Sequence, residues 1–408
     1  MSGPLSGIKV VELATFVAAP VTTRLLADLG AEVVKVEASG GDAWRRSGIS
    51  FGAKRFSAEE NPVFDIYNTG KKLISLNLKT PEGKDAMHRL LSQADVFVTN
   101  MRPAALTRLG FGYEDIKALY PRLVYACVLG YGEDGPDGGK PAFDTTAFWA
   151  RSGFLRDMAP RTEDYHPVIA PYSVGDTATG FLLMGEISAA LFQRTRTGKG
   201  DYVSSTLYHN AIFCMGTMAI MTQAPFGREY PLLPIEQGIG NCYRCSDDEW
   251  VYVALGDAAK TLPRFHTLIG HPELNEDPRF ENHAARCINR DAHVAYFREA
   301  FLTQPADYWV RLAEEHDVTL VRMAHFKDVS EDPQAWANGF LEHVSFPNGN
   351  TDTMPTSPIE MGNAAPPPTA HVPAVGTHTV ELLQTLGYTQ EQISAMLKSG
   401  AAFGGNHG

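Results

Sequence analysis

One acidic residue stands where a carboxylate could act as a nucleophile. Asp176 lies in the segment SVGDTATG, residues 173–180, which opens a long helical stretch from about Thr177 to Gln193. The free N–H groups and the dipole of a helix start favour a negative charge, typically by about 0.3–1 kcal/mol. We therefore expect Asp176 to be ionised and nucleophilic. Spacing alone leaves open the alternative that Asp176 is an N-cap with only a structural role.

A group of basic side chains is the second feature that could do chemistry. Several of them fall at the ends of expected strands or in the turns that follow. In doubly wound sheets, ligands bind at the carboxyl ends of the strands, so these cations could hold a phosphate-rich ligand. Scattered surface charge is an equally open alternative. The group comprises Arg45, Arg46, Lys71, Lys72, Lys79, Arg102 and Arg108.

Several familiar cofactor motifs are missing. The first expected βα turn, residues 14–20, lacks G-x-G-x-x-G, and the chain has no Walker A sequence. Both absences argue against an enzyme that uses NAD, FAD or ATP. Cys242-x-x-Cys245 has no second Cys or His pair at ligand spacing, so we interpret it as two half-buried thiols and expect no metal.

The elements that must position these residues alternate between strands and helices. Strands are expected at 8–13, 33–37, 72–78, 95–99, 123–129 and 202–207. Helices are expected at 20–28, 81–94, 104–109, 113–119 and 209–221, besides the long helix that follows Asp176. This alternation predicts an α/β fold with a mostly parallel sheet covered on both faces.

Composition shifts near residues 223–240, and we expect a second, smaller α+β domain over about 226–330. It would begin with a hairpin, residues 242–245 and 250–255, followed by helices at 258–269, 283–302 and 305–315. A proline-rich stretch at 366–373 suits an extended linker. Two helices would end the chain, 377–386 and 389–398, the second with a capping box of Thr389 and Gln392.

Composition excludes some classes of protein. The 408 residues are 44% apolar and 20% charged, with a formal net charge of −12. Net acidity argues against non-specific nucleic-acid binding, which needs a basic field. The longest apolar stretch, near 211–221, is too short to span a bilayer, and five scattered cysteines are no disulfide framework. We expect a cytoplasmic protein with small-molecule partners and no membrane contact.

Short motifs follow one another in a fixed order along nearly the whole chain. They include LSGIKVVEL at 5–13, LGAEVVKVE at 29–37, NTGKK at 68–72, Gly175-Asp176, RTGKG at 196–200 and DPRF at 277–280. The series resembles the class III CoA-transferases, also called the CaiB/BaiF family, which includes formyl-CoA transferase and α-methylacyl-CoA racemase. Any one motif is weak, but their order is highly specific.

The resemblance implies a fold and an assembly. The large Rossmann-like domain would span 1–210 and be completed by helices near 375–408. A linker at 211–225 would lead to the small domain at 226–330, and a return linker would cover 331–374. The family forms interlocked homodimers in which each subunit is a ring threaded by the other.

The resemblance also implies a reaction, in which CoA moves between an acyl-CoA and a free carboxylic acid. Asp176 matches the family nucleophile, which forms an acyl-aspartyl anhydride and then an aspartyl-CoA thioester. Coenzyme A is then a co-substrate. The positions that match its contacts are Val17, Ala18, Leu76, Asn77, Leu78, Lys79, Asn100, Met101, Arg102, Arg108, Phe143 and Asp144.

Departures from the family pattern narrow the expected substrate. Val17 and Phe143 replace the Gln and Tyr of formyl-CoA transferases, Ala38 replaces an Arg that contacts CoA, and residues 237–240 are at best a remnant of the glycine-rich lid. Oxalate is therefore disfavoured as acceptor. Residues 143–153 and 331–338 look like those of 2-hydroxyacid CoA-transferases, and Val17, Phe143, Phe148 and Trp149 would form an apolar pocket. Core packing of the last two is the open alternative.

Two other functions remain open at this point. One is racemisation or epimerisation of an acyl-CoA, which the missing His at position 143 disfavours because phenylalanine cannot move a proton. The other is a non-catalytic CoA-binding protein.

Overall fold

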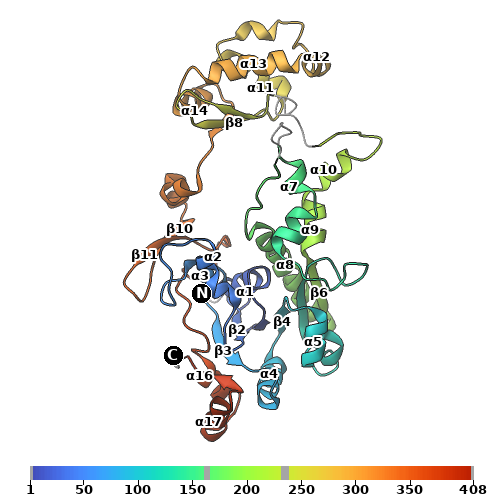
Figure 1. Cartoon of the computed structure of the whole chain (residues 1–408), viewed down its shortest axis with the longest axis vertical. Coiled ribbons are helices and arrows are strands. Elements are labelled where there is room, and N and C mark those ends of the chain that lie inside the picture. Colours follow the sequence, from blue (N-terminus) through green and yellow to red (C-terminus); the bar gives the residue numbers. More distant parts are fainter. Residues whose placement is uncertain (1–2, 160–165, 231–238, 406–408) are drawn as a thin grey trace. The chain divides into compact units, whose positions relative to one another are not determined.

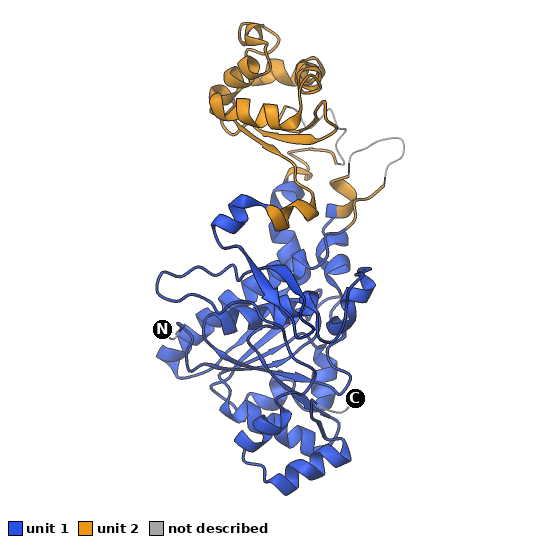
Figure 2. Cartoon of the chain, turned by 90° about the vertical axis from the view of Figure 1, so that its left-hand side faces the viewer, with its two compact units in different colours: residues 1–154, 170–220, 332–408 blue, residues 155–169, 221–331 orange. Residues whose placement is uncertain are grey.

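The structure is a computed structural model that describes residues 3–159, 166–230 and 239–405. It divides into two compact units (Figure 2). Unit 1 comprises residues 1–154, 170–220 and 332–408, and unit 2 comprises residues 155–169 and 221–331. Most of the return linker predicted at 331–374 thus belongs to unit 1, where it includes the antiparallel hairpin of β10 (Leu341–Ser345) and β11 (Thr351–Pro355).

Unit 1 is built on a seven-stranded sheet with the order β12-β3-β2-β1-β4-β5-β6 (Figure 1). Six of these strands are parallel, as the alternating pattern predicts, and β12 (Ala402–Phe403) runs antiparallel to β3. Their runs are largely apolar because a parallel sheet is covered on both faces. The parallel strands are β1 (Lys9–Leu13), β2 (Glu32–Glu37), β3 (Lys72–Leu76), β4 (Val96–Thr99), β5 (Val124–Leu129) and β6 (Tyr202–Thr206).

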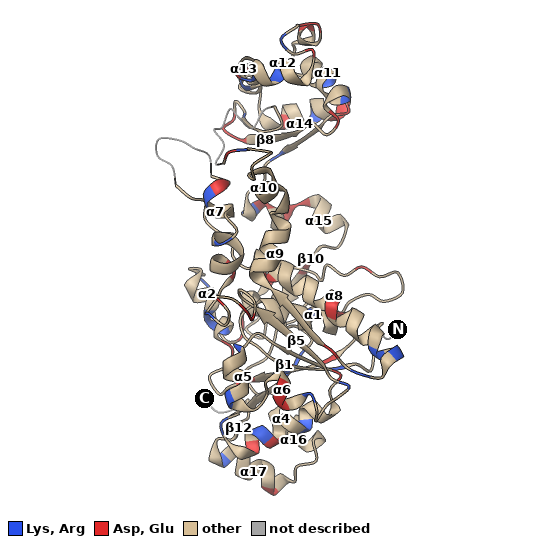
Figure 3. Ribbon diagram, turned by 90° about the vertical axis from the view of Figure 1, so that its right-hand side faces the viewer, with Lys and Arg blue, Asp and Glu red and all other residues tan. Residues whose placement is uncertain are grey.

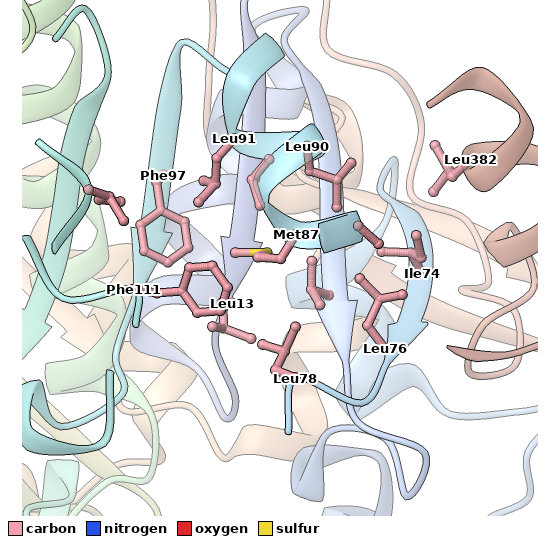
Figure 4. Close-up of a cluster of buried hydrophobic side chains, with 14 of the residues drawn as sticks. Leu13, Ile74, Leu76, Leu78, Met87, Leu90, Leu91, Phe97, Phe111 and Leu382 are labelled. Atoms are coloured by element: carbon pink, nitrogen blue, oxygen red, sulfur yellow. The ribbon is translucent and has the colours of Figure 1, made fainter. Parts of the chain in front are cut away.

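Helices follow β1, β3 and β4 in the predicted order, but the three short helices between β2 and β3, at residues 43–46, 47–50 and 62–68, were not predicted. Pro at the first helical position starts three of them, α3 (Pro62–Asn68), α4 (Pro81–Gln93) and α5 (Pro103–Leu109), where its missing N–H costs nothing. The apolar face of α4 packs into the main core, where Met87, Leu90 and Leu91 meet Phe97 of β4 (Figure 4). The remaining helices of this part are α1 (Ala18–Asp28), η1 (Ala43–Arg46), α2 (Ser47–Ser50) and α6 (Tyr113–Ile116).

The long helix α8 (Val174–Thr197) packs against α1. Their contact requires Gly180, because a Cβ there would lie 2.1 Å from Cγ1 of Val21. Two differences from the predicted elements lie near α8. The helix predicted at 209–221 is two helices, α9 (Leu207–Cys214) and α10 (Gly216–Met221), and residues 144–150 form a π-helix, η2 (Asp144–Ala150), that no pattern predicted.

The chain of unit 1 ends with α16 (Thr379–Thr385) and α17 (Gln390–Ser399), and the predicted capping box of Thr389 and Gln392 is present. Three short helices complete the chain: α7 (Phe154–Asp157), η5 (Phe326–Glu331) and α15 (Pro333–Ala337).

Unit 2 has its own core around a three-stranded antiparallel sheet, β7-β8-β9. The hairpin of β7 (Cys242–Arg244) and β8 (Trp250–Ala254) confirms the prediction, and β9 (Thr319–Arg322) adds to it. Cys242 is partly buried and Cys245 is buried, both as free thiols. The helices are α11 (Ala258–Leu268), η4 (Pro272–Asn275), α12 (His283–Ile288), α13 (Arg290–Phe301) and α14 (Ala306–Glu315). Across the described residues of both units, no helix is long and apolar enough to cross a membrane.

Candidate active site

Asp176 lies in the first turn of α8, at its third helical position. The N-cap is Ser173, which has a left-handed backbone with φ of 68°. The alternative that Asp176 is the N-cap is therefore wrong. A non-glycine residue in this backbone region is costly, by roughly 1–3 kcal/mol, and such residues cluster at functional sites.

A second carboxyl group, that of Asp144, is held against the backbone next to the candidate nucleophile. Asp144 is the first residue of the π-helix η2 and is 6% exposed. A Cβ at position 175 would lie 2.3 Å from Oδ1 of Asp144 and 2.4 Å from Cγ of Phe148. Only glycine fits at position 175, so close packing explains why a glycine precedes Asp176.

The pKa values of both carboxyl groups are raised, and the charge of Asp144 contributes to the shift of Asp176. Burial, and then the negative charge of Asp144, raise the pKa of Asp176 to about 7. Burial raises the pKa of Asp144 to about 6, although the nearby N–H groups of Trp149, Ser173, Gly175 and Asp176 oppose the rise. Desolvation and a like charge thus raise the pKa of Asp176 against the helix dipole, so the expected ionisation is only partial at neutral pH.

Asp176 opens into a cavity of about 250 Å³ at the carboxyl ends of β1, β4 and β5. This is the edge of the sheet at which ligands bind in doubly wound folds. The cavity brings together seven of the residues predicted for the site, from four separate parts of the chain. They are Val17, Ala18, Asn100, Met101, Arg102, Phe143 and Asp176.

The turn after β1 forms one wall of this cavity and is fixed from two sides. Asn100 receives a hydrogen bond from the N–H of Thr15 (3.1 Å) and donates one to its carbonyl (2.6 Å). Phe16 has a φ of 64°, and its N–H donates to Oδ1 of Asp42 at 3.0 Å. Asn100 is therefore placed to position the cavity wall through the backbone.

A buried network of charges lies beneath the same turn. Nζ of Lys35 is 2.6 Å from Glu12 and 2.9 Å from Asp42, and it donates to the carbonyl of Ala14 at 3.0 Å. Lys71 pairs with Glu12 at 2.8 Å. The two ammonium groups lower the pKa of Glu12 to about 2 against its burial, and the carboxylates raise that of Lys35.

This network corrects part of the predicted phosphate-binding group. Lys71 is buried in an ion pair, and Arg45 binds Glu37 at 3.0 Å and the carbonyl of Pro373 at 3.1 Å. Lys72 pairs with Glu381. Lys and Arg positions are scattered among Asp and Glu positions along the ribbon of both units (Figure 3). Of the group, Arg102 and Arg108 are exposed and line a neighbouring cavity of about 600 Å³ on α5, which Tyr113, Tyr125 and Tyr202 also line.

Some predicted contacts do not reach the cavity of Asp176. Leu76 and Leu78 lie in the hydrophobic core, and Asn77 accepts a hydrogen bond from the N–H of Lys79, whose side chain is exposed. They follow β3, three strand spacings or about 14 Å from β4. Ala38 lies on the exposed turn after β2. Of the lid remnant, residues 237 and 238 lie outside the described residues.

Of the four residues predicted to form an apolar pocket, only two line the cavity. Phe148 and Trp149 are 3% and 6% exposed, with their rings 4.9 Å apart, so they are core residues, while Val17 and Phe143 line the cavity. Sequence reasoning missed a set of aromatic side chains near the cavity. They come from four separate segments, and no spacing in the sequence links Phe16, Trp44, Phe51, Tyr67 and Tyr172.

A mostly parallel sheet with a carboxylate and a cavity at its carboxyl edge is the arrangement of an α/β protein that binds its ligand at this edge. Residues 5–379 match the CoA-transferase family III, and the chain belongs to this family. It is a class III CoA-transferase, as the ordered motifs predict.

Three relatives with named activities align over almost the whole chain. The (R)-2-hydroxy-4-methylpentanoate CoA-transferase of Clostridioides difficile is 38% identical, over 96% of this chain and 97% of the relative. The cinnamoyl-CoA:phenyllactate CoA-transferase of Clostridium sporogenes is 35% identical, over 96% of each chain. A succinyl-CoA:glutarate CoA-transferase of Homo sapiens is 30% identical, over 97% of this chain and 89% of the relative.

Solved structures agree with the fold. A crystal structure of Rv3272 from Mycobacterium tuberculosis superposes with a TM-score of 0.80 at 30% identity, over 93% of this chain and 99% of that one. A CaiB/BaiF family protein from Brucella suis gives a TM-score of 0.78 at 29% identity, over 95% and 100%.

Proposed function

We propose that this enzyme moves CoA between an acyl-CoA and a free carboxylic acid, with Asp176 as the nucleophile. The acids would be of medium size and apolar, aromatic or 2-hydroxylated. The observation that carries the proposal is the placement of Asp176 in the first turn of α8, open to a cavity that Val17, Arg102 and Phe143 also line.

The exchange would proceed in balanced steps. A carboxylate oxygen of Asp176 attacks the thioester carbonyl, the C–S bond breaks, and CoA leaves as the thiolate with an acyl-aspartyl anhydride behind it. The thiolate attacks the aspartyl carbonyl of the anhydride, which releases the first acid and leaves an aspartyl-CoA thioester. The acceptor carboxylate then repeats the two steps in reverse. Dividing one difficult exchange in this way is the advantage of nucleophilic catalysis.

Groups around Asp176 support these steps. Each addition places negative charge on a carbonyl oxygen, which the positive end of the α8 helix dipole is suited to stabilise. Burial and the charge of Asp144 together would hold Asp176 between its two protonation states near neutral pH, since they raise its pKa to about 7. Phe143, 55% exposed, covers the cavity from its apolar side.

CoA would lie along the carboxyl edge of the sheet. Its thioester would face Asp176, with Val17 and Ala18 beside it, and its phosphates would meet Arg102 and Arg108, whose exposed guanidinium groups suit phosphate oxygens. Asn100 and Met101 would border the pantetheine arm, and Leu76, Asn77, Leu78 and Lys79 would contribute backbone or surface contacts farther along the edge.

We also infer a homodimer of interlocked subunits in the cytoplasm. Besides Val174 at the start of α8, five large apolar side chains of α8 and α9 are exposed, a pattern that marks an interaction surface. They are Phe181, Leu182, Phe192, Ile212 and Phe213. A second copy of the chain would cover them. Sedimentation should give twice the chain mass, and a monomer at micromolar concentration would contradict the inference.

The test is CoA exchange followed by mass spectrometry. The purified enzyme is given a panel of acyl-CoAs and free acids, including cinnamate, phenyllactate, branched 2-hydroxyacids, succinate and oxalate. We expect new acyl-CoAs from the apolar acids. Asp176→Asn should lower the exchange rate by at least about 10³-fold, while the secondary structure stays intact.

Two results would refute the proposal. Full exchange by Asp176→Asn would exclude the aspartyl intermediates. No exchange with any pair, but deuterium uptake at the α-carbon of a 2-methylacyl-CoA, would replace transfer by epimerisation and require a base other than Phe143.

A further inference from the structure

Unit 1 contains another cavity beside the candidate nucleophile, which we name the aromatic pocket. It measures about 430 Å³, within the range of small-molecule sites, and its walls include Trp44, Phe51, Val63, Tyr67, Tyr172 and Met354. These residues come from η1 and the segment after α2, from α3, from the segment before α8 and from β11. None of the described residues that line the pocket carries a charge.

The aromatic pocket reaches the start of the nucleophile helix. Ser173, the N-cap of α8, lines the pocket and lies three residues before Asp176. Burial raises the pKa of Tyr67, and its hydroxyl is hydrogen-bonded to the side chains of Ser173 and Thr177, close enough to Asp176 to feel its charge. Tyr67 therefore lines the pocket and also contacts the first turn of the nucleophile helix.

A continuous run of aromatic rings joins the pocket to the cavity of Asp176. The ring of Phe143, in the nucleophile cavity, is 5.5 Å from that of Phe16, which is 6.1 Å from Trp44. Trp44 is 5.6 Å from Phe51, and Phe51 is 5.3 Å from Tyr172. Phe16, a member of this run, has a left-handed backbone. Backbone strain of this kind is retained where the surrounding structure requires a side chain at a particular position.

We propose that the aromatic pocket holds the hydrocarbon side chain of the acid whose carboxyl group reacts at Asp176, and that it selects branched aliphatic and phenyl-bearing acids. This inference rests on the proposed function. The departing acid and the incoming acid occupy the acyl site in turn, so one pocket would screen both. A second carboxylate in the pocket would be desolvated without a partner, which would select against dicarboxylates.

The test compares acids that differ only in the side chain. Phe51→Ala and Tyr172→Ala are suitable variants, because these residues are 44% and 61% exposed and their truncation leaves the core intact. We expect kcat/KM for 2-hydroxy acids with a phenyl or isobutyl group to fall about 10- to 100-fold, and that for 2-hydroxypropanoate to change by less than about threefold. Phe326→Ala, at a side chain 97% exposed in unit 2, is the matched control and should change neither value.

The milder variants Phe51→Leu and Tyr172→Leu keep the test decisive if truncation to alanine disturbs the fold. They should show the same ranking of acids with smaller losses. An equal loss for every acid, or an unchanged preference, would overturn the pocket while leaving CoA transfer in place. Failure of the unaltered enzyme to transfer CoA to any acid would instead refute the proposed function, and the pocket's role with it.

Discussion

Asp176 and Asp144 are two carboxyl groups in one partly buried site, so the charge of one depends on that of the other. Asp176 must be ionised to attack a thioester. Because burial and Asp144 raise its pKa to about 7, kcat/KM for the acyl-CoA should rise with pH through about 7 and level off above it.

Asp144→Asn tests this coupling. Removing the like charge should lower the pKa of Asp176, so the rise of kcat/KM should move to a lower pH. Burial remains, so the midpoint should stay above the ordinary value for aspartate. A pH–rate profile of both enzymes measures the shift. A midpoint that stays in place or moves upward would contradict the coupling.

Lys35 does not line the cavity, but the turn that forms one cavity wall depends on it. Its ammonium group is fully buried between Glu12 and Asp42, and Asp42 in turn holds the N–H of Phe16. Lys35→Met leaves two buried carboxylates short of a partner and should lower the free energy of unfolding by about 3–5 kcal/mol. Lys72→Met, which removes an exposed pair with Glu381, should cost less than about 1 kcal/mol. Denaturant titration compares the two, and equal losses would show that the buried network does not stabilise the turn.

At the scale of elements, the start of α8 and the π-helix η2 meet at Gly175. Gly175→Ala would drive a Cβ into Asp144 and Phe148 and should lower the exchange rate at least about tenfold, with a loss of roughly 1–3 kcal/mol in stability. Gly185→Ala in the same helix meets nothing within 4 Å and should be neutral or stabilising by about 0.5–1 kcal/mol. Turnover and thermal unfolding of both variants measure the difference; an active, stable Gly175→Ala enzyme would mean that the two elements do not meet so closely.

The sequence is a good guide to elements whose signal is local. Apolar runs predict β1 to β6, proline marks the starts of α4 and α5, and Thr389 with Gln392 marks α17. The π-helix η2 was missed because its irregular backbone gives no periodic pattern. The break between α9 and α10 was missed because one apolar stretch runs through it.

The candidate site could likewise be predicted only where the sequence carries a recognisable signal. Asp176 could be found because it lies at the start of a helix, whereas Val17 and Asn100 were found only through the resemblance to the class III CoA-transferases. The aromatic pocket could not, since Trp44, Tyr67 and Tyr172 are neighbours only in the folded chain. Lys71 was misassigned because a sequence does not tell a buried lysine, paired with Glu12, from an exposed one.

For the whole molecule, unit 2 adds a pH-dependent contribution to stability. Nε2 of His266 and Nε2 of His293 are 2.7 Å apart in its core, and Nδ1 of His266 contacts Oδ1 of Asn275 at 2.7 Å. Burial, His266 and Arg286 lower the pKa of His293 to about 3, and Asp277 only partly offsets them. The pair is therefore uncharged in the folded protein near neutral pH.

The lowered pKa of His293 determines how the stability of the fold changes with pH. The unfolded chain binds a proton at His293 near pH 6.5 and the folded chain near 3, so stability is complete above about 6.5 and is lost as pH falls between the two values. The Tm should fall on acidification from pH 7.5 to 5, and His293→Gln should flatten this dependence by about one proton. An equally steep dependence in the variant would assign the loss to other groups.

The central claim is that Asp176 carries the acyl group covalently, and isotope transfer tests it most directly. In a single turnover with an acceptor acid labelled with ¹⁸O in both carboxylate oxygens, anhydride formation and collapse should leave one ¹⁸O in the side chain of Asp176. Mass spectrometry of the peptide that contains residue 176 should then show a gain of one ¹⁸O, and no gain when acyl-CoA is left out. Fragmentation should place the label on Asp176 and find none on Asp144. Turnover that produces labelled acyl-CoA but leaves Asp176 unlabelled would contradict the account.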